Sequence, residues 1–132
     1  MVTETLNELS SRNRDLIVVE QKTFGYVEDK YHVKIPPTLR DRKFDFSVIN
    51  KDKATSIEVN FYSGTGSKPS EIVSSYINRA EVLSAAGWMF IWLTDGIGWK
   101  KMQRPLHVGV ENINYVINAN FLRKGLLEKI IV

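Results

Sequence analysis

The chain has 132 residues, of which 43% are hydrophobic and 11% aromatic, so it is long enough for one domain with a substantial core. It has no cysteine, which excludes disulfides and thiolate metal sites and is typical of a reducing cytoplasm. No apolar run approaches the roughly 20 residues of a membrane span, and the N-terminus lacks a signal-peptide pattern. We therefore expect a single cytoplasmic domain over residues 1–132, with no membrane partner. The net charge of +3 permits nucleic-acid binding without requiring it.

The first third of the chain predicts a helix, a strand and a second short helix. Residues 5–8 have the spacing of a capping box, so we expect a helix within the first dozen residues. Residues 16–23 are rich in β-branched side chains and predict a strand. Residues 24–33 can form one or two helical turns, which end before Pro36 and Pro37 because proline breaks helices.

The next two segments, residues 42–49 and 54–62, predict a β-hairpin. Both alternate polar and apolar side chains with period two, and the polar residues between them are few enough for a turn. If Asn50 faces Lys53, counting back along both strands places Asp45 directly opposite Glu58. One face then carries Phe44, Phe46, Val48, Ile57, Val59 and Phe61, and the other carries Lys43, Asp45, Ser47, Ser56, Glu58 and Asn60.

Asp45 and Glu58 are candidate metal ligands, because facing side chains in an antiparallel pair have Cβ atoms about 4.5–5.5 Å apart. Two carboxylates that close repel each other unless a cation neutralises them. Mg²⁺ prefers carboxylate oxygens and keeps several waters, so two acids and a backbone carbonyl can hold one ion against a phosphate. The alternative is a solvated polar face on which the two acids pair with Lys43 or Lys53. The spacing alone leaves both interpretations open.

A glycine-containing loop follows the hairpin at residues 63–68. Gly64 and Gly66 allow the backbone to approach a ligand closely, and Ser67 and Lys68 stand where the next helix begins. A helix N-terminus attracts anions, so this loop is a candidate phosphate contact. The alternative is an ordinary strand-to-helix turn with Ser67 as the N-cap.

The second half of the chain predicts a long helix followed by strands. Residues 69–86 carry apolar side chains at helical spacing, and this helix is expected to end at Gly87. Residues 88–93 are a continuous apolar run, which predicts a strand buried on both faces. We also expect a strand at residues 115–117 and an amphipathic helix at 121–130. The order helix, three strands, helix, strand predicts an α/β fold with a mixed central sheet flanked by helices.

Several strings in the chain resemble a known nuclease family. Asp45, followed on the next strand by Glu58-Val59-Asn60 within an αβββαβ order, resembles the core of the PD-(D/E)XK nucleases. The motif of that superfamily is an acid followed by acid-any-lysine on adjacent strands. The strings RKFDF, EVNFYSGTGSK, FIWLTDGIGW and NYVINANFLRKGLL resemble the DpnII/MboI family of type II restriction endonucleases, which cut DNA at GATC. The resemblance implies a catalytic core without the N-terminal portion of the longer family members.

The resemblance also implies a function: Mg²⁺-dependent hydrolysis of phosphodiester bonds in double-stranded DNA, with no further cofactor. Asp45 and Glu58 would hold the ion, and Asn60 would position the attacking water where the general motif has lysine. The family string itself carries asparagine at this position. Candidate DNA contacts are Lys43, Gly64, Gly66, Ser67 and Lys68, and Lys68 would also take part in catalysis. A palindromic target implies a homodimer with one active site for each strand.

Two other functions remain open on the sequence alone. One is a catalytically inactive DNA-binding or assembly module that keeps the nuclease fold. The other is a repair nuclease of the same fold, whose target is DNA structure rather than DNA sequence. Glu4, Glu8 and Glu20 are weaker candidates for accessory metal ligands, and each is more simply a solvated or paired side chain.

Overall fold

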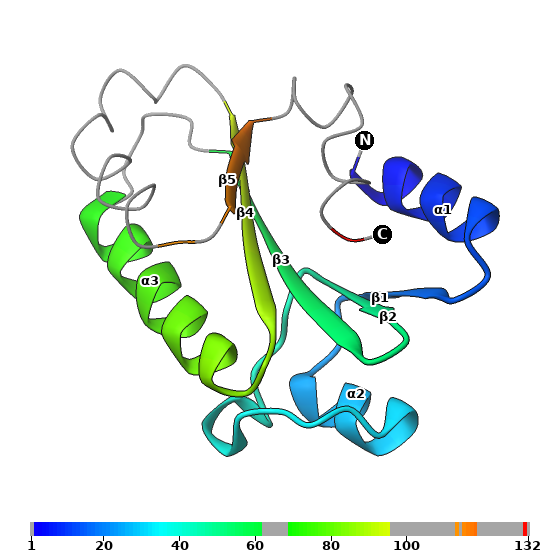
Figure 1. Ribbon diagram of the computed structural model, residues 1–132. Coiled ribbons are helices and arrows are strands. Elements are labelled where there is room, and N and C mark those ends of the chain that lie inside the picture. Colours follow the sequence, from blue (N-terminus) through cyan, green and yellow to red (C-terminus); the bar gives the residue numbers. More distant parts are fainter. Residues whose placement is uncertain (1, 62–68, 96–112, 114, 119–130, 132) are drawn as a thin grey trace.

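The computed structural model describes residues 2–61, 69–95, 113, 115–118 and 131. These residues form a mixed sheet of five strands with helices on both of its faces (Figure 1). The elements are α1 (Val2–Arg12), β1 (Leu16–Glu20), α2 (Phe24–Tyr31), the 3-10 helix η1 (Pro37–Leu39), β2 (Phe46–Asn50), β3 (Lys53–Phe61), α3 (Pro69–Ala85), β4 (Met89–Asp95) and β5 (Tyr115–Asn118). The predicted α/β fold is confirmed, and α2 is a full short helix between the first two strands.

The strands lie in the order β1-β2-β3-β4-β5 across the sheet. β1, β2 and β3 are antiparallel neighbours, whereas β3, β4 and β5 run parallel to one another. In the hairpin, Asn50 faces Lys53 and Phe46 faces Ile57. This register is the one that the alternation and the short turn predict.

The strand predicted at residues 42–49 begins later, at Phe46, because the chain bends at Asp45. Before the bend, Lys43 forms an isolated antiparallel bridge with Thr23 instead of continuing the hairpin ladder. Asp45 is therefore the last residue before β2, at the bend of the chain.

Two hydrophobic clusters lie on opposite faces of the sheet. Helix α1 covers one, whose buried members are Val2, Leu6, Leu9, Leu16, Phe46, Val48, Ile57, Ile91, Leu93 and Ile131. Helices α2 and α3 cover the other, whose largest buried side chains are Phe24, Phe44, Leu83, Trp88, Phe90 and Trp92. The expectation that Phe44 shares a face with Phe46 is wrong, because the bend at Asp45 turns Phe44 toward Phe24, 5.2 Å away between ring centroids.

Helix α3 connects the parallel neighbours β3 and β4, so it runs antiparallel to both across the sheet (Figure 1). It ends before Gly87, whose φ of 86° is a left-handed conformation that glycine adopts without strain. β4 is buried on both faces, as predicted. Phe90 and Trp92 join the cluster under α3, while Ile91 and Leu93 join the cluster under α1.

Helix α1 begins at Val2, so the predicted capping box at residues 5–8 lies inside the helix rather than at its start. The predicted loop at residues 63–68 and the predicted helix at 121–130 lie outside the described residues. In the described part of the chain, no helix has the length and hydropathy that a membrane span requires.

Candidate active site

The polar face of the β2–β3 hairpin lies beneath α3 rather than in solvent. Its buried polar side chains, together with their neighbour on β4, are Ser47, Ser56, Glu58 and Thr94. Because β3 and β4 are parallel neighbours, Trp92 lies beside Glu58 on the same face. This burial contradicts the interpretation of the hairpin's polar face as a solvated surface.

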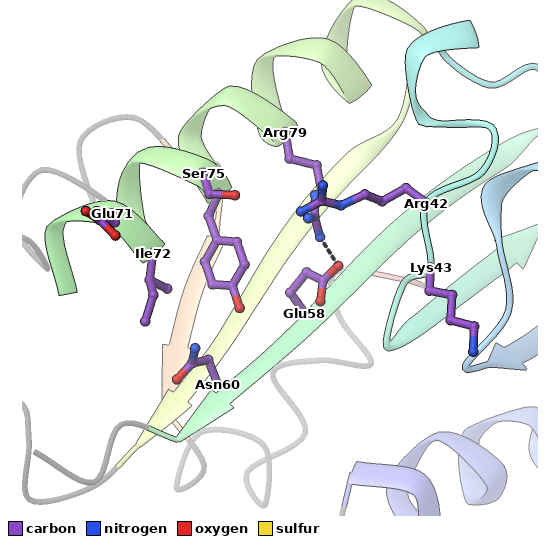
Figure 2. A pocket seen from close by; sticks show the side chains of 9 residues that line it. Arg42, Lys43, Glu58, Asn60, Glu71, Ile72, Ser75 and Arg79 are labelled. Atoms are coloured by element: carbon purple, nitrogen blue, oxygen red, sulfur yellow. Dashed lines mark hydrogen bonds and ion pairs between the residues drawn. The ribbon is translucent and has the colours of Figure 1, made fainter. Parts of the chain in front are cut away.

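A pocket of about 420 Å³ lies between this face and α3 (Figure 2). From the sheet side and the segment before β2 it is lined by Arg42, Lys43, Glu58 and Asn60. From α3 it is lined by Glu71, Ile72, Ser75, Tyr76 and Arg79, which recur at helical spacing and so share one side of the helix. The structure therefore brings the predicted catalytic residues Glu58 and Asn60 into one pocket with Lys43.

Glu58 forms a buried ion pair with Arg79, in which Arg79 Nη1 donates to Glu58 Oε1 (Figure 2). The Arg79 side chain is 8% exposed to solvent and the Glu58 side chain 7%. The Arg79 guanidinium also lies 5.9 Å from the centroid of the Tyr76 ring, within range of a cation–π contact. The partner of Glu58 is thus neither Lys43 nor Lys53, and the Lys43 side chain points away from Glu58 in Figure 2.

Asp45 lies at the bend before β2, where a backbone hydrogen bond fixes its carboxylate. Oδ2 accepts a hydrogen bond of 2.8 Å from the backbone N–H of Val59, the residue after Glu58. Oδ1 accepts a hydrogen bond of 3.3 Å from Gln21 Nε2 at the protein surface. Each carboxylate oxygen has more than one acceptor site, so these bonds leave capacity for a cation.

Burial raises the pKa of Glu58 to about 8, because the buried carboxylate loses the water that would stabilise its charge. Arg79 opposes this shift, whereas the neighbouring Asp45 carboxyl group adds to it. The bond from the Val59 N–H to Asp45 brings the two predicted metal ligands close together in space, and their role as ligands stays a prediction. Such a pair binds a proton, or a cation in its place, more readily than isolated carboxylates do.

Asn60 follows Glu58 on the same face of β3, where it interacts with Tyr76 of α3. Burial raises the pKa of Tyr76, and hydrogen bonding to Asn60 opposes that shift. Because α3 runs antiparallel to β3, Tyr76 meets Asn60 while Arg79, one helical turn later, meets Glu58. An amide cannot act as a base at neutral pH, but it can hydrogen-bond and position a water.

The donor set of Asp45 and Glu58 fits a hard divalent cation. Among the described residues, no three histidine, cysteine or acidic side chains gather closely enough to form a larger metal site. Two carboxylates suffice for Mg²⁺, which retains waters and takes further oxygens from a substrate phosphate. The hydrogen bond from the Val59 backbone N–H holds the Asp45 carboxylate next to the residue that precedes Val59, which is Glu58.

The remaining predicted site residues divide into two groups. Those of the loop lie outside the described residues, and their roles stay predictions: Gly64, Gly66, Ser67 and Lys68. The weaker candidates Glu4 and Glu8 lie on α1, which packs on the opposite face of the sheet from Glu58. Glu20 is exposed and accepts a hydrogen bond from Thr3. None of these three acids joins Asp45 and Glu58.

Arg79 and the polar role of Tyr76 were not predicted from the sequence. Helical spacing from Ile72 and Tyr76 places Arg79 on the buried side of α3. A charged side chain in that position needs an internal partner of opposite charge. Glu58, on the polar face of the hairpin, is that partner. The helical spacing therefore indicated a buried arginine, but its partner could be identified only after α3 was placed on the sheet.

Comparison with known proteins places this site in a family. The model of the DpnII restriction endonuclease matches residues 1–129. The chain is 33% identical over 135 residues to the type II restriction enzyme MjaIII of Methanocaldococcus jannaschii, covering 99% of the chain and 47% of that relative. It is 34% identical over 109 residues to the type II restriction enzyme DpnII of Streptococcus pneumoniae, covering 79% of the chain and 38% of the relative.

A third relative, the type II restriction enzyme LlaDCHI of Lactococcus lactis subsp. cremoris, is 29% identical over 111 residues, covering 81% of the chain and 36% of the relative. The chain thus spans less than half the length of each of these relatives. No solved structure matches it. The family match includes the hairpin that carries Asp45, Glu58 and Asn60 and the helix that carries Arg79. On this evidence, the chain belongs to the DpnII restriction endonuclease family.

Proposed function

We propose that this chain is the catalytic core of a Mg²⁺-dependent type II restriction endonuclease, which hydrolyses phosphodiester bonds of double-stranded DNA at GATC sites. The observation that carries the proposal is the closeness of Asp45 to Glu58, set by the bond from the Val59 N–H to Asp45, beside a pocket that Arg42 and Lys43 also line. Membership of a family whose curated members are named type II restriction enzymes supports the same reaction.

Asp45 and Glu58 would hold the Mg²⁺ ion, which supplies charge neutralisation at the scissile phosphate and lowers the pKa of a bound water. Asp45 is held for this role by the backbone N–H of Val59. Asn60 orients the attacking water by a hydrogen bond, and Tyr76 on α3 holds the Asn60 amide. Lys68 would contact the phosphate from the loop, as the family resemblance implies.

Arg42 and Lys43 supply positive charge at the pocket. Both are exposed and line it beside Glu58 and Asn60. Duplex DNA carries one negative charge about every 1.7 Å of helix axis, so a cleavage site needs lysine or arginine side chains around it. These contacts position the DNA backbone and carry no sequence information themselves.

A palindromic target favours two copies of the chain related by a two-fold axis, each cutting one strand. We therefore propose a homodimer on DNA. Analytical ultracentrifugation of the chain with a duplex that carries one site is the direct test, and a complex with one copy of the chain contradicts the dimer.

The second candidate function is a DNA-binding module without cleavage. The observation that favours it is the pairing of Glu58 with Arg79, which occupies one oxygen of a proposed metal ligand. This candidate predicts that DNA is retained in a binding assay and stays intact with every divalent cation tested.

A plasmid assay separates the two functions. The purified chain is incubated with unmethylated plasmid in Mg²⁺, beside an EDTA control and a plasmid methylated at adenine in GATC, and fragment ends are mapped. Discrete ends at GATC, absent with EDTA, support the restriction function. Cleavage at flaps or junctions without a preferred sequence would instead indicate a repair nuclease of the same fold.

A further inference from the structure

We propose that Arg79 is a positioning residue of the active site, which holds the Glu58 carboxylate in place for the divalent cation. The inference rests on the proposed function, because it takes Glu58 as a metal ligand. Ligating carboxylates are themselves held by hydrogen bonds from outer partners, whose loss costs about 10–100-fold in metal affinity or activity. Arg79 meets the requirements for such a partner.

The contact itself leaves Glu58 able to bind a cation. Arg79 Nη1 bonds to Oε1 of the carboxylate. A carboxylate has two oxygens with about four acceptor sites, so Oε2 stays available to another ligand. Asp45, just before β2, bonds to the backbone N–H of the residue after Glu58, so Glu58 lies near both Asp45 and Arg79 of α3. Fixing one oxygen restricts the rotation of the whole group.

The packing of α3 fixes Arg79 in turn. Arg79 is 7% exposed, and the residues around it on the same side of the helix are buried in the core: Val73, Ala80 and Leu83. The Tyr76 ring lies one turn earlier, with its centroid 5.9 Å from the guanidinium. The guanidinium therefore cannot shift far without moving the helix. A fork-shaped donor on a fixed helix is suited to orienting a carboxylate.

An exposed arginine of the same pocket provides a matched control. Arg42 lines the pocket but is exposed, and Glu58 forms its ion pair with Arg79. Removing Arg42 takes one positive charge from the pocket and leaves the Glu58 contact in place. Removing Arg79 takes away one charge and the contact together, so a comparison of the two variants separates positioning from simple charge.

The test is calorimetric titration of the full chain with Mg²⁺, without DNA. Arg79→Gln should bind Mg²⁺ about 10–100-fold more weakly than the wild type. Arg79→Lys should fall between them, because lysine keeps the charge without the planar fork. Arg42→Gln should match the wild type or bind slightly more tightly.

An Arg79→Gln variant with wild-type or tighter affinity overturns the inference, and tighter binding would show that Arg79 is a place-holder that the cation displaces. Equal weakening in Arg42→Gln also overturns it, because pocket charge would then be the cause. A wild type that binds no Mg²⁺ contradicts the proposed metal site as well. Binding that is lost in Asp45→Ala but unchanged in Arg79→Gln contradicts the positioning role alone.

If Arg79→Gln does not fold, a measurement on the wild type tests the positioning role of Arg79. The Nη–H resonances of Arg79, which include the donor to Glu58, are followed by ¹H–¹⁵N NMR at low temperature as Mg²⁺ is added. A resonance that stays protected from exchange with water supports the inference, because the bond to Glu58 persists beside the cation. Loss of that protection on saturation shows that Arg79 is released, and overturns it.

Discussion

Trp92 on β4 lies directly beside Glu58 on β3, and both side chains are on the sheet face that α3 covers. Trp92 is fully buried, its Nε1 has no hydrogen-bond partner among the described residues, and its ring lies 5.4 Å from that of Tyr76. A large buried aromatic ring therefore lies on the next strand beside the acid. This environment explains physically why the pKa of Glu58 is raised.

The contribution of Glu58 to the stability of the metal-free chain should fall as the pH rises from about 4.5 to about 8. The pKa of Glu58 is 4.5 in the unfolded chain and about 8 in the folded one. Between these values the folded protein holds a proton that the unfolded chain has released, so each rise in pH favours unfolding. The stabilisation is complete below the lower pKa and lost above the higher one.

Urea unfolding in EDTA at several pH values measures this decline. Glu58→Gln cannot titrate at this position, so the difference in unfolding free energy between wild type and variant should change over the same pH interval. A difference that stays constant between these two pKa values would show that Glu58 titrates normally in the folded chain.

Tyr76→Phe should slow cleavage about tenfold at saturating Mg²⁺ while leaving the Mg²⁺ affinity unchanged. The variant removes the hydroxyl that interacts with Asn60 but keeps the ring against Trp92 and Arg79. Loss of such a supporting hydrogen bond costs about 10–100-fold in activity. Single-turnover cleavage measures the rate, and an unchanged rate would show that Asn60 needs no support from Tyr76.

Lys43→Gln should weaken DNA binding about equally for cognate and unrelated duplexes. Lys43 is exposed at the pocket, and a lysine that neutralises one phosphate contributes about 1 to the slope of log affinity against log salt. Fluorescence anisotropy at several salt concentrations measures that slope. Lys53→Gln, at the turn end of β3, is the control with the same charge change. Equal effects of the two variants would mean that Lys43 lies outside the DNA contact.

Thr23→Ala should lower the stability of the chain by about 1 kcal/mol without changing metal affinity. The Thr23 side chain caps α2 by accepting a hydrogen bond of 3.1 Å from the backbone N–H of Tyr26. Thr23→Ser retains a capping hydroxyl and should stay close to the wild type. Thermal unfolding compares the three proteins, and equal loss in Thr23→Ser would point to packing of the threonine methyl group instead.

The closeness of Asp45 and Glu58 could be predicted because two features of the sequence fix the hairpin register as far as Phe46 and Ile57, the residues next to them. Strict alternation assigns each side chain to a face, and the short turn at Asn50 and Lys53 sets the register. Alternation shows only that the two faces differ, so it could not tell whether the polar face meets solvent or a helix. The burial of Glu58 under α3 is a tertiary contact that this local pattern does not encode.

The role of Arg79 was not predicted because it too depends on a tertiary contact. Its contact is with a strand residue much earlier in the chain, and helical spacing alone identifies the buried side of α3 but not what lies opposite. The position of Phe44 was wrong because the bend at Asp45 breaks the alternation. In both cases one element had to be placed against another before the residue could be interpreted.

The most direct test of the proposed metal site compares the cleavage activity of the wild type and Asp45→Ala. Both proteins are incubated in Mg²⁺ with one labelled duplex that carries a single GATC site. We expect the wild type to cut at the site, and Asp45→Ala to leave the duplex intact while still shifting it in a binding assay, because the variant removes one of the two proposed metal ligands. Equal cutting by both proteins would contradict the assignment of Asp45 and Glu58 as the catalytic metal site.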